Sequence, residues 1–439
     1  MSAIEGEWSG VLAAGGMQLR LRLVIGPGEQ ATLFSLDQGG QAIVADQVVI
    51  SDGSVRLRFP SVRGRFEGNL SGETLTGTWT QGAGVPLQFV RGAALPPVEA
   101  LSNSRLLALR EQSGAPGIAA AAQHRNGRSV ALVNGLRQIH AAAPIATDDQ
   151  WHVGSITKSM TALLVARLAE EGVVAWDTPL YEMLRQAVPD MLGAYRTVTF
   201  RHLLSHRSGL AANIPMDQFV RFPRTEVDAR ASRIAYARIA LGAVPAGPLE
   251  AHFEYSNSGY IVAGAILEAV TGEPWEVLIQ RHVFDVLGLA SAGFGAPGRP
   301  GALDQPVGHA QGLLQLRAYP PGGAVTDNPA VLGPAGRVHI SLSDLLVYGG
   351  VHRDRTSYLQ PAGWDMLHTP PFGGDYAMGL VRRSDGSLWH NGSNTLFYAE
   401  LLIDPAGGGV AAAAANSGAL ERVQPAVHSA VTQAMVAVG

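Results

Sequence analysis

The sequence of 439 residues contains no cysteine. Disulfide bonds, thiol nucleophiles and cysteine-ligated zinc are therefore excluded together, and redox chemistry gives no indication of the compartment. Charged residues are also scarce, at 15% of the chain, and the formal net charge is −4. Because clusters of basic residues are missing, we expect no nucleic-acid partner.

Long apolar runs are missing too. No stretch of 18 apolar residues occurs, so we expect a soluble chain without a membrane-spanning helix. The opening residues MSAIEGEWSG lack the basic segment and apolar stretch of a signal peptide, which indicates a cytoplasmic protein. A protein whose signal peptide had been removed would look the same, and a periplasmic location therefore stays open.

Lysine is almost absent. Of the 32 lysine and arginine residues only Lys158 is lysine. A GC-rich genome would explain the preference for arginine but not the position of the remaining lysine. Arginine stays protonated in proteins, whereas a buried lysine can lose its proton. The retained lysine therefore indicates a position where deprotonation matters.

The composition, with 46% hydrophobic residues, is that of a globular protein, and the length predicts more than one core. Residues 8–91 contain short runs of alternating apolar and polar residues between glycine turns, which predict an antiparallel barrel or sandwich. We therefore divide the chain into an all-β domain over 1–93, a linker over 94–100 and a second domain over 101–439. The predicted strands are GMQLRLRLVIG, QATLFSL, AIVADQVVIS, SVRLRFP, GRFEGNL and TLTGTWTQ.

The second domain mixes strands and helices. A hairpin is predicted over 117–140, with its turn near Asn126-Gly127, and further strands are predicted over 387–392 and 397–415. Strands from both ends of the domain, with helices between them, indicate a sheet that distant residues complete, in an α/β or α+β domain. Helices are predicted over 101–113, 157–172, 258–271, 275–286 and 419–438.

Ser155-Ile156-Thr157-Lys158 is the first motif that can carry chemistry. If Ser155 opens a helix, Lys158 lies one turn later on the same face, within reach of the hydroxyl. A serine needs a neighbouring base to act as a nucleophile, and a lysine of lowered pKa can be that base. The alternative is a serine that caps a helix beside a solvated lysine.

Tyr255-Ser256-Asn257 is the second motif. A phenol between a lysine and a serine can relay a proton, and an amide side chain can hold a substrate carbonyl while it fixes the lysine. The alternative is a loop tyrosine packed on the core, followed by an asparagine that caps the next helix.

His390-Asn391-Gly392-Ser393, at the end of a predicted strand, is the third motif. Glycine at 392 lets a substrate backbone lie along the strand edge, and the following N–H can donate to an oxyanion together with the N–H of Ser155. His390 would supply a positive or a hydrogen-bonding group. A lone strand histidine is otherwise a structural residue.

The order Ser-x-x-Lys, Tyr-x-Asn and His-x-Gly resembles the serine β-lactamase and penicillin-binding-protein superfamily, in particular its class C-like branch of D-specific peptidases, esterases and lactamases. HLLSHRSGL at 202–210 and GPAGRVHISLSDLLVYG at 333–349 resemble further segments of that branch. The likeness spans about residues 100–439. It implies an α/β domain in which helices flank an antiparallel sheet, with a helical subdomain.

The resemblance also implies roles for the motif residues. Ser155 would form an acyl-enzyme, and Lys158 and Tyr255 would share base and acid duty. The N–H groups of Ser155 and Ser393 would form the oxyanion hole, and no cofactor or metal is implied. The residues expected to bind substrate or the oxyanion are Asn257, His390, Asn391, Gly392 and Ser393. Histidine at 390, where true lactamases carry Lys-Thr-Gly, resembles the D-peptidase members and argues against antibiotic hydrolysis.

The first domain resembles the lipocalin-like β-barrels attached to some of these hydrolases. The likeness rests on Gly6-Glu7-Trp8-Ser9-Gly10 and Gly77-Thr78-Trp79-Thr80-Gln81. Barrels of this size are often filled by their own side chains, so we expect a structural domain.

Two other enzyme classes fit poorly. His202 and His206 stand four residues apart, as zinc ligands on a helix do, but no glutamate follows His202 and no third ligand is near. No serine lies in the Gly-x-Ser-x-Gly pattern of an α/β-hydrolase. Two non-enzymatic alternatives remain, a penicillin-binding sensor with a reactive Ser155 and a scaffold with an idle one.

The sequence thus predicts a serine hydrolase that forms an acyl-enzyme with a small-molecule or short-peptide substrate, a peptide or amide that contains a D-residue. A carboxylesterase with the same site is the first alternative. A slow-turnover penicillin-binding protein or weak β-lactamase is the second. The sequence implies no oligomeric state.

Overall fold

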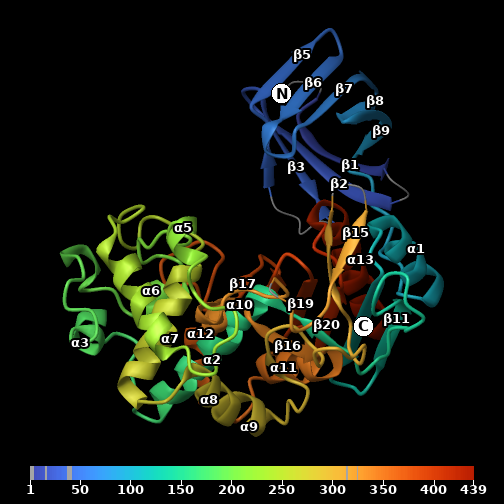
Figure 1. Ribbon diagram of the computed structural model, residues 1–439. Coiled ribbons are helices and arrows are strands. Elements are labelled where there is room, and N and C mark those ends of the chain that lie inside the picture. The colour runs from blue at the N-terminus through green and yellow to red at the C-terminus, as the bar shows by residue number, and fades with distance from the viewer. Residues whose placement is uncertain (1–3, 15–16, 37–41, 313–314, 324) are drawn as a thin grey trace. The chain divides into compact units, whose positions relative to one another are not determined.

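The computed structural model describes residues 4–439 except 15–16, 37–41, 313–314 and 324. The chain forms two compact units, Met1–Glu99 and Ala100–Gly439. The first unit is all-β, and the second combines sheets with helices (Figure 1). This architecture confirms the predicted multidomain fold class, an antiparallel β unit followed by an α/β domain.

The first unit is one antiparallel sheet of nine strands in the order β4-β3-β2-β1-β9-β8-β7-β6-β5. Two of these strands, β1 and β9, are absent from the predicted runs. The strands are β1 Gly6–Ala14, β2 Met17–Gly26, β3 Gln30–Ser35, β4 Ala42–Val44, β5 Gln47–Ser51, β6 Ser54–Phe59, β7 Gly64–Ser71, β8 Thr74–Gln81 and β9 Ala83–Arg91.

This sheet curls because its two edge strands are successive parts of one chain segment. The Ala45 N–H donates to the carbonyl of Ala31 on the β3 edge. The next N–H, of Asp46, donates to the carbonyl of Arg58 on the β6 edge. The single strand predicted over 42–51 is therefore two short strands that pair with opposite edges.

Side chains fill the interior of the curled sheet. Trp8, Phe59, Phe66, Trp79 and Phe89 are all buried there. The Phe66 and Phe89 rings meet edge to face, with centroids 5.4 Å apart, an arrangement that aromatic quadrupoles favour. The core of this unit is thus packed with its own residues.

The second unit is built on a six-stranded antiparallel sheet in the order β11-β10-β20-β19-β18-β17. Strands from the beginning and the end of this unit's sequence pair in the middle of the sheet, because β10 lies next to β20 and Ile118 lies opposite Ala415. Residues far apart in the sequence therefore complete one sheet, as predicted. The strands are β10 Gly117–His124, β11 Ser129–Gly135, β17 Val381–Arg382, β18 Leu388–Ser393, β19 Tyr398–Asp404 and β20 Gly409–Ala415.

Helices cover both faces of the central strands. Alternate alanines of β10 and β20 pack in one core with α1 (Asn103–Ser113) and α13 (Leu420–Val438), and the others pack in the core that contains α11 (Leu342–Asp354). Small side chains let these helices approach closely: a Cβ added at Gly409 would lie 2.3 Å from the Met435 sulfur. The run of alanines in β20 is thus explained by close packing, despite the low strand propensity of alanine.

The remaining helices form a group beside the sheet, on the side away from α1 and α13 (Figure 1). Helix α7 is its centre and contacts α2, α3, α4 and α6. The helices are α2 Thr157–Glu170, α3 Leu180–Leu184, α4 Phe200–Leu204, α5 Met216–Phe219, α6 Arg230–Gly242, α7 Asn257–Thr271, α8 Trp275–Ile279, α9 Asp285–Leu287, α10 Gly333–Gly336 and α12 Pro361–His368. Two short strands, β12 Gln150–His152 and β13 Gly293–Phe294, each pair with β16 Val338–Ser341. A separate pair is formed by β14 Gly308–Gln311 and β15 Leu316–Tyr319.

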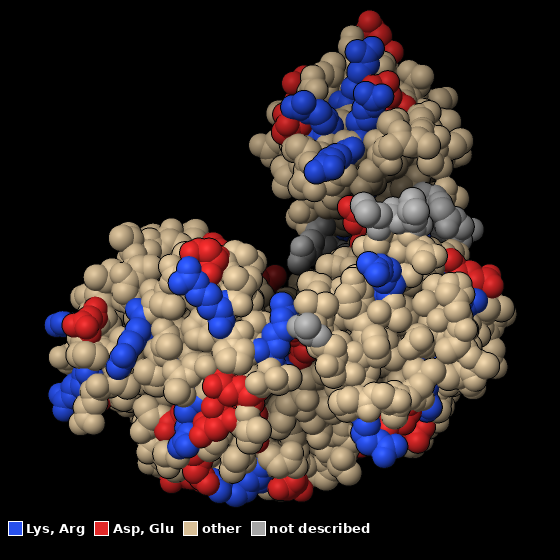
Figure 2. Space-filling view, viewed as in Figure 1, with Lys and Arg blue, Asp and Glu red and all other residues tan. Residues whose placement is uncertain are grey.

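Charged side chains are scattered over the face shown in Figure 2, where acidic and basic residues lie near one another. This pattern agrees with the low charge content of the chain. Within the described residues, no helix combines the length and apolar character needed to cross a bilayer.

Several histidines of the second unit are held neutral by burial. Desolvation lowers the pKa of His309, His339 and His368 to about 4 and that of His390 to about 3. The contacts of His309 fit only a neutral ring. Its Nδ1 donates to the carbonyl of Asn416, and its Nε2 accepts the N–H of Ile139, a bond that protonation would break.

We expect the free energy of unfolding to fall as the pH drops from about 6.5 towards 4, because the unfolded chain then binds protons that the folded protein rejects. Each histidine of lowered pKa contributes up to about 1.4 kcal/mol per pH unit to this decrease in the free energy of unfolding. Urea unfolding at about pH 7.5, 6 and 5 measures this slope. His368→Gln should flatten it and His140→Gln, at an exposed position, should not. Equal midpoints at all three pH values would contradict the prediction.

Candidate active site

Ser155 lies in a tight turn just before α2. The 3₁₀ turn Gly154–Ile156 starts at a residue with φ of +50°, a left-handed conformation that favours glycine. From Trp151 to Met160 every residue is buried except Ser155, which stays partly accessible. Ser155 thus sits two residues before the helix rather than in its first turn, and its hydroxyl still faces Lys158.

Lys158 is fully buried and surrounded by uncharged acceptors. Its Nζ lies 2.9 Å from Ser155 Oγ, 2.7 Å from Asn257 Oδ1 and 2.7 Å from the carbonyl oxygen of Ala335 in α10. Burial without a counter-ion lowers the pKa of Lys158 to about 7. These contacts suit the neutral amine, which donates to the amide and the carbonyl and offers its lone pair to the serine proton.

Tyr255 lies in the loop before α7. Its hydroxyl is hydrogen-bonded to the Ser155 side chain, and its ring centroid lies 4.9 Å from Lys158 Nζ. Desolvation raises the pKa of Tyr255 above its ordinary value, although 36% of the residue is exposed. The phenol therefore keeps its proton at a pH where Lys158 loses one.

Asn257 is the first residue of α7, whose N-cap is Ser256. Its Oδ1 accepts from Lys158, and its Nδ2 donates to Asn213 Oδ1 at 2.9 Å. The amide is thus held at both ends. No local pattern in the sequence pointed to Asn213, because its partner Asn257 lies 44 residues further along the chain.

Strand β18 approaches the Ser155 turn closely because both segments carry glycine. A Cβ added at Gly392 would lie 2.4 Å from the Ser155 nitrogen and 2.1 Å from the Val153 oxygen. A Cβ added at Gly154 would lie 2.3 Å from the Ser393 nitrogen. The close approach brings the backbone at 155 and at 393 together, where the oxyanion hole is predicted.

His390 is a neutral hydrogen-bonding residue. Burial, and then the charge of Lys158, lowers its pKa to about 3, which favours the hydrogen-bonding group over the positive group among the two predicted alternatives. Its Nδ1 faces the carbonyl oxygen of Asn391 at 2.5 Å and must donate to it. Its Nε2 then accepts from the hydroxyl of Tyr376 at 3.0 Å.

Asn391 points away from this cluster, and its predicted role in substrate binding is corrected. Its Nδ2 donates to the Tyr398 hydroxyl at 2.9 Å, which donates to Glu400 Oε1 at 2.7 Å. Tyr398 packs in the core beneath α13. Successive side chains of a strand point to opposite faces, so Asn391 cannot share the face of His390. The other predicted residues, Ser155, Lys158, Tyr255, Asn257, His390, Gly392 and Ser393, are brought together.

The two histidines considered as zinc ligands, His202 and His206, make contacts with different partners. His202 Nδ1 accepts the Thr199 N–H at the start of α4, and its Nε2 lies 3.1 Å from Glu250 Oε1. His206 Nδ1 accepts the Ser256 N–H at 3.0 Å, and its ring packs against the Tyr255 ring. His206 therefore holds the loop that carries Tyr255. In the part of the chain that the structure describes, no three metal-ligating side chains converge.

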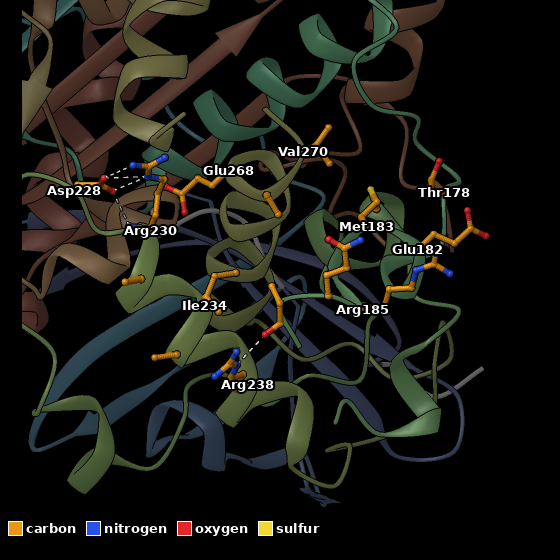
Figure 3. A pocket seen from close by; sticks show the side chains of 15 residues that line it. Thr178, Glu182, Met183, Arg185, Asp228, Arg230, Ile234, Arg238, Glu268 and Val270 are labelled. Carbon is orange, nitrogen blue, oxygen red and sulfur yellow. Dashed lines mark hydrogen bonds and ion pairs between the residues drawn. The ribbon is translucent and has the colours of Figure 1, made fainter. Parts of the chain in front are cut away.

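A groove of about 1080 Å³ lies elsewhere, between α3, α6 and α7. Figure 3 shows the ion pair of Asp228 with Arg230 at one end and the bond from Arg238 to the carbonyl of Ala187. None of the residues of the candidate active site lines this groove. Its size alone does not connect it with the Ser155 chemistry.

An accessible serine hydroxyl beside a buried lysine of lowered pKa, a protonated phenol and a fixed amide defines a serine hydrolase. The family model described as Beta-lactamase matches residues 103–433. The chain belongs to this family, which confirms the predicted superfamily.

Relatives and solved structures agree with this assignment. Penicillin-binding protein 4 of Amycolatopsis lactamdurans is 28% identical over 72% of this chain and 84% of its own length. Esterase EstB of Burkholderia gladioli is 28% identical over 43% of this chain, which spans about half (49%) of that protein. The D-stereospecific amidohydrolase structure from Streptomyces sp. has a TM-score of 0.58 at 22% identity and covers 74% of this chain and 98% of its own, a likeness of fold.

Gly392→Ala should abolish most activity, because the new methyl group would push β18 away from the Ser155 turn. We expect the rate of ester hydrolysis to fall at least about 100-fold, the effect of losing an oxyanion donor. Gly242→Ala is the matched control, since a Cβ there meets no atom within 4 Å. Melting temperatures of both variants separate loss of fold from loss of site geometry. A Gly392→Ala enzyme with normal turnover would show that the close approach is unimportant.

Proposed function

We propose that this chain hydrolyses a peptide or amide bond beside a D-residue through an ester formed on Ser155. The observation that carries the proposal is the neutral environment of Lys158, which lets a lysine act as a base near pH 7. Tyr255, of raised pKa, remains the acid. The pKa directions therefore favour Lys158 as the base in the free enzyme, although the two groups exchange protons during the reaction.

In the acylation step Lys158 Nζ takes the proton of Ser155, and Ser155 Oγ attacks the substrate carbonyl carbon. The oxygen of the tetrahedral intermediate becomes negative and accepts hydrogen bonds from the N–H groups of Ser155 and Ser393. Asn257 holds the substrate through its amide while it also holds Lys158. The charge on Lys158 is then balanced within the site by the oxyanion.

Breakdown of the intermediate needs a proton on the leaving nitrogen. The Tyr255 hydroxyl supplies it and recovers a proton from the Lys158 ammonium, so both groups return to their starting states. A water molecule then attacks the ester, passes its proton to the same pair, and the released Ser155 oxygen regains a hydrogen. The product is a free carboxylic acid, and Ser155, Lys158 and Tyr255 are back in their starting states.

One observation favours an amide over an ester. An amine departs poorly without protonation, whereas an alkoxide departs more easily, and the site keeps a protonated phenol in place. The residues brought together around Ser155 are uncharged when Lys158 is neutral, which suits a neutral substrate of either kind. The D-residue preference rests on likeness to D-stereospecific hydrolases and on histidine at 390.

A carboxylesterase with the same residues is the second candidate. EstB, a relative named for esterase activity, supports it, and the attack of Ser155 on the carbonyl carbon would be the same. A penicillin-binding protein that releases its acyl group slowly is the third, supported by the name of the Amycolatopsis relative. The three candidates differ in the substrate and in the rate of deacylation.

Because Lys158 must be neutral to accept the serine proton, kcat/KM should rise with pH and reach half its maximum near pH 7. Lys158→Arg keeps the positive charge but has no accessible neutral form, so its kcat/KM should fall by about 10³-fold or more. A chromogenic ester followed from about pH 5 to 9 measures both. A flat profile, or near-normal activity of Lys158→Arg, would exclude lysine as the base.

A substrate screen distinguishes the three candidates. Short D- and L-peptide amides, p-nitrophenyl esters, nitrocefin and a fluorescent penicillin are compared on wild type and Ser155→Ala. We expect turnover of D-peptide amides above that of L-peptide amides, and none by Ser155→Ala, which lacks the nucleophile. Turnover of esters alone would establish an esterase. Persistent fluorescent labelling without turnover would establish a penicillin-binding protein, and a Ser155→Ala enzyme as active as wild type would reject the whole proposal.

A further inference from the structure

A buried carboxylate that the proposed reaction does not use lies where three catalytic segments meet. Asp327 is 7% exposed and belongs to the loop that precedes α10. Its Oδ2 accepts from Arg337 Nε at 3.0 Å, and its Oδ1 accepts from Asn394 Nδ2 at 3.2 Å. His152 Nε2 lies 3.0 Å from the same Oδ1.

Each of these partners is close in sequence to an atom of the active site. Arg337 comes two residues after Ala335, whose carbonyl oxygen accepts from Lys158. Asn394 directly follows Ser393, whose N–H is one of the two predicted oxyanion donors. Asp327 thus ties the lysine acceptor and one side of the oxyanion hole to the same carboxylate.

The third connection passes through an imidazole ring. The Gly154 N–H donates to His152 Nδ1 at 3.1 Å, so Nδ1 is an acceptor and the ring proton is on Nε2, which lies 3.0 Å from Asp327 Oδ1. Gly154 directly precedes Ser155, the other oxyanion donor and the nucleophile. The ring therefore links the position of Asp327 to the position of the Ser155 turn.

The charge on Asp327 is stable because it is shared. Burial would raise the pKa of Asp327, but His152, Arg337 and the Asn394 amide together lower it to about 2. Asn394 is itself fixed, since its Oδ1 accepts the N–H groups of Leu396 and Phe397. The bonds from Arg337 and Asn394 are charge-assisted hydrogen bonds, which hold their partners more firmly than neutral ones. His152 Nε2 makes a close polar contact with the same carboxylate, without the alignment of a hydrogen bond.

We infer that Asp327 is the positioning residue of the oxyanion hole, acting through His152 on the N–H of Ser155 and through Asn394 on the N–H of Ser393. It touches no substrate in this scheme. Oxyanion donors act only when they are held at the place that the developing charge will occupy, so a small displacement weakens the transition state more than the bound substrate. This inference rests on the proposed acyl-enzyme function.

The test compares Asp327→Asn with a control that loses a buried carboxylate elsewhere. Glu268 is buried and paired with the buried Arg233 in the helical group, so Glu268→Gln carries a similar structural cost away from the site. The probes are p-nitrophenyl butyrate for kcat and KM and phenylboronic acid, which forms a tetrahedral adduct with the serine oxygen. Melting temperatures are measured on every variant.

For Asp327→Asn we expect kcat to fall about 100-fold and phenylboronic acid to bind at least about 10-fold more weakly, with KM changed less than about 3-fold. Glu268→Gln should keep all three values near wild type even where its melting temperature drops. If Asp327→Asn keeps kcat within about 3-fold, or if both variants lose activity alike, the inference is wrong.

His152→Phe provides a second route if Asp327→Asn does not fold. It keeps the ring volume and the Asp327–Arg337 ion pair but removes the bond to Gly154, and it should lower kcat and boronate binding together by about 10-fold. Unchanged kcat in a folded His152→Phe enzyme would also overturn the inference. If wild type and Ser155→Ala hydrolyse the ester equally, the proposed function fails instead, whatever Asp327 does.

Discussion

The site depends on an amine that is buried without a counter-ion. Lys158 lies at 0% exposure among a hydroxyl, an amide oxygen and a carbonyl oxygen, and none of these can balance a positive charge. Desolvation of an ion is costly, so the neutral form becomes accessible near pH 7. An acidic neighbour would restore the charge and remove the base. The aromatic rings of Tyr255 and Tyr260 near the amine add bulk and exclude water without adding a carboxylate.

The architecture of the second unit supplies this environment from separate elements. Helix α2 carries Lys158, α7 begins with Asn257, and α10 presents the Ala335 carbonyl. Strand β18 comes close to the Ser155 turn only because glycine occupies 154 and 392. The packing of helices on the sheet therefore determines the pKa of Lys158, and loss of any of these contacts would change that pKa.

Much of this arrangement could be predicted from the sequence because its parts are local. Ser155 and Lys158 are three residues apart at the start of α2, and Tyr255 lies two residues before Asn257, which opens α7. The direction of Asn391 was missed because it depends on which face of β18 turns towards Ser155. Asp327, Tyr376 and Asn213 were missed because their partners are distant in sequence. Helices α6 and α12 are absent from the predicted helices, although the buried residues of α6, from Arg233 to Leu241, recur at helical spacing. The strands β4 and β5 look like one strand until their partners are known.

The lone lysine has a consequence for the chemistry of the protein's surface. Because Lys158 is the only side chain with an amine and is fully buried, acylating dyes and amine cross-linkers find no lysine on the outside of the folded second unit. With a pKa of about 7, this amine is uncharged in a large share of the molecules at neutral pH and can then act as a nucleophile in its own right. An amine-reactive electrophile that fits beside Ser155 would therefore modify one lysine side chain per molecule, inside the site and not on the surface.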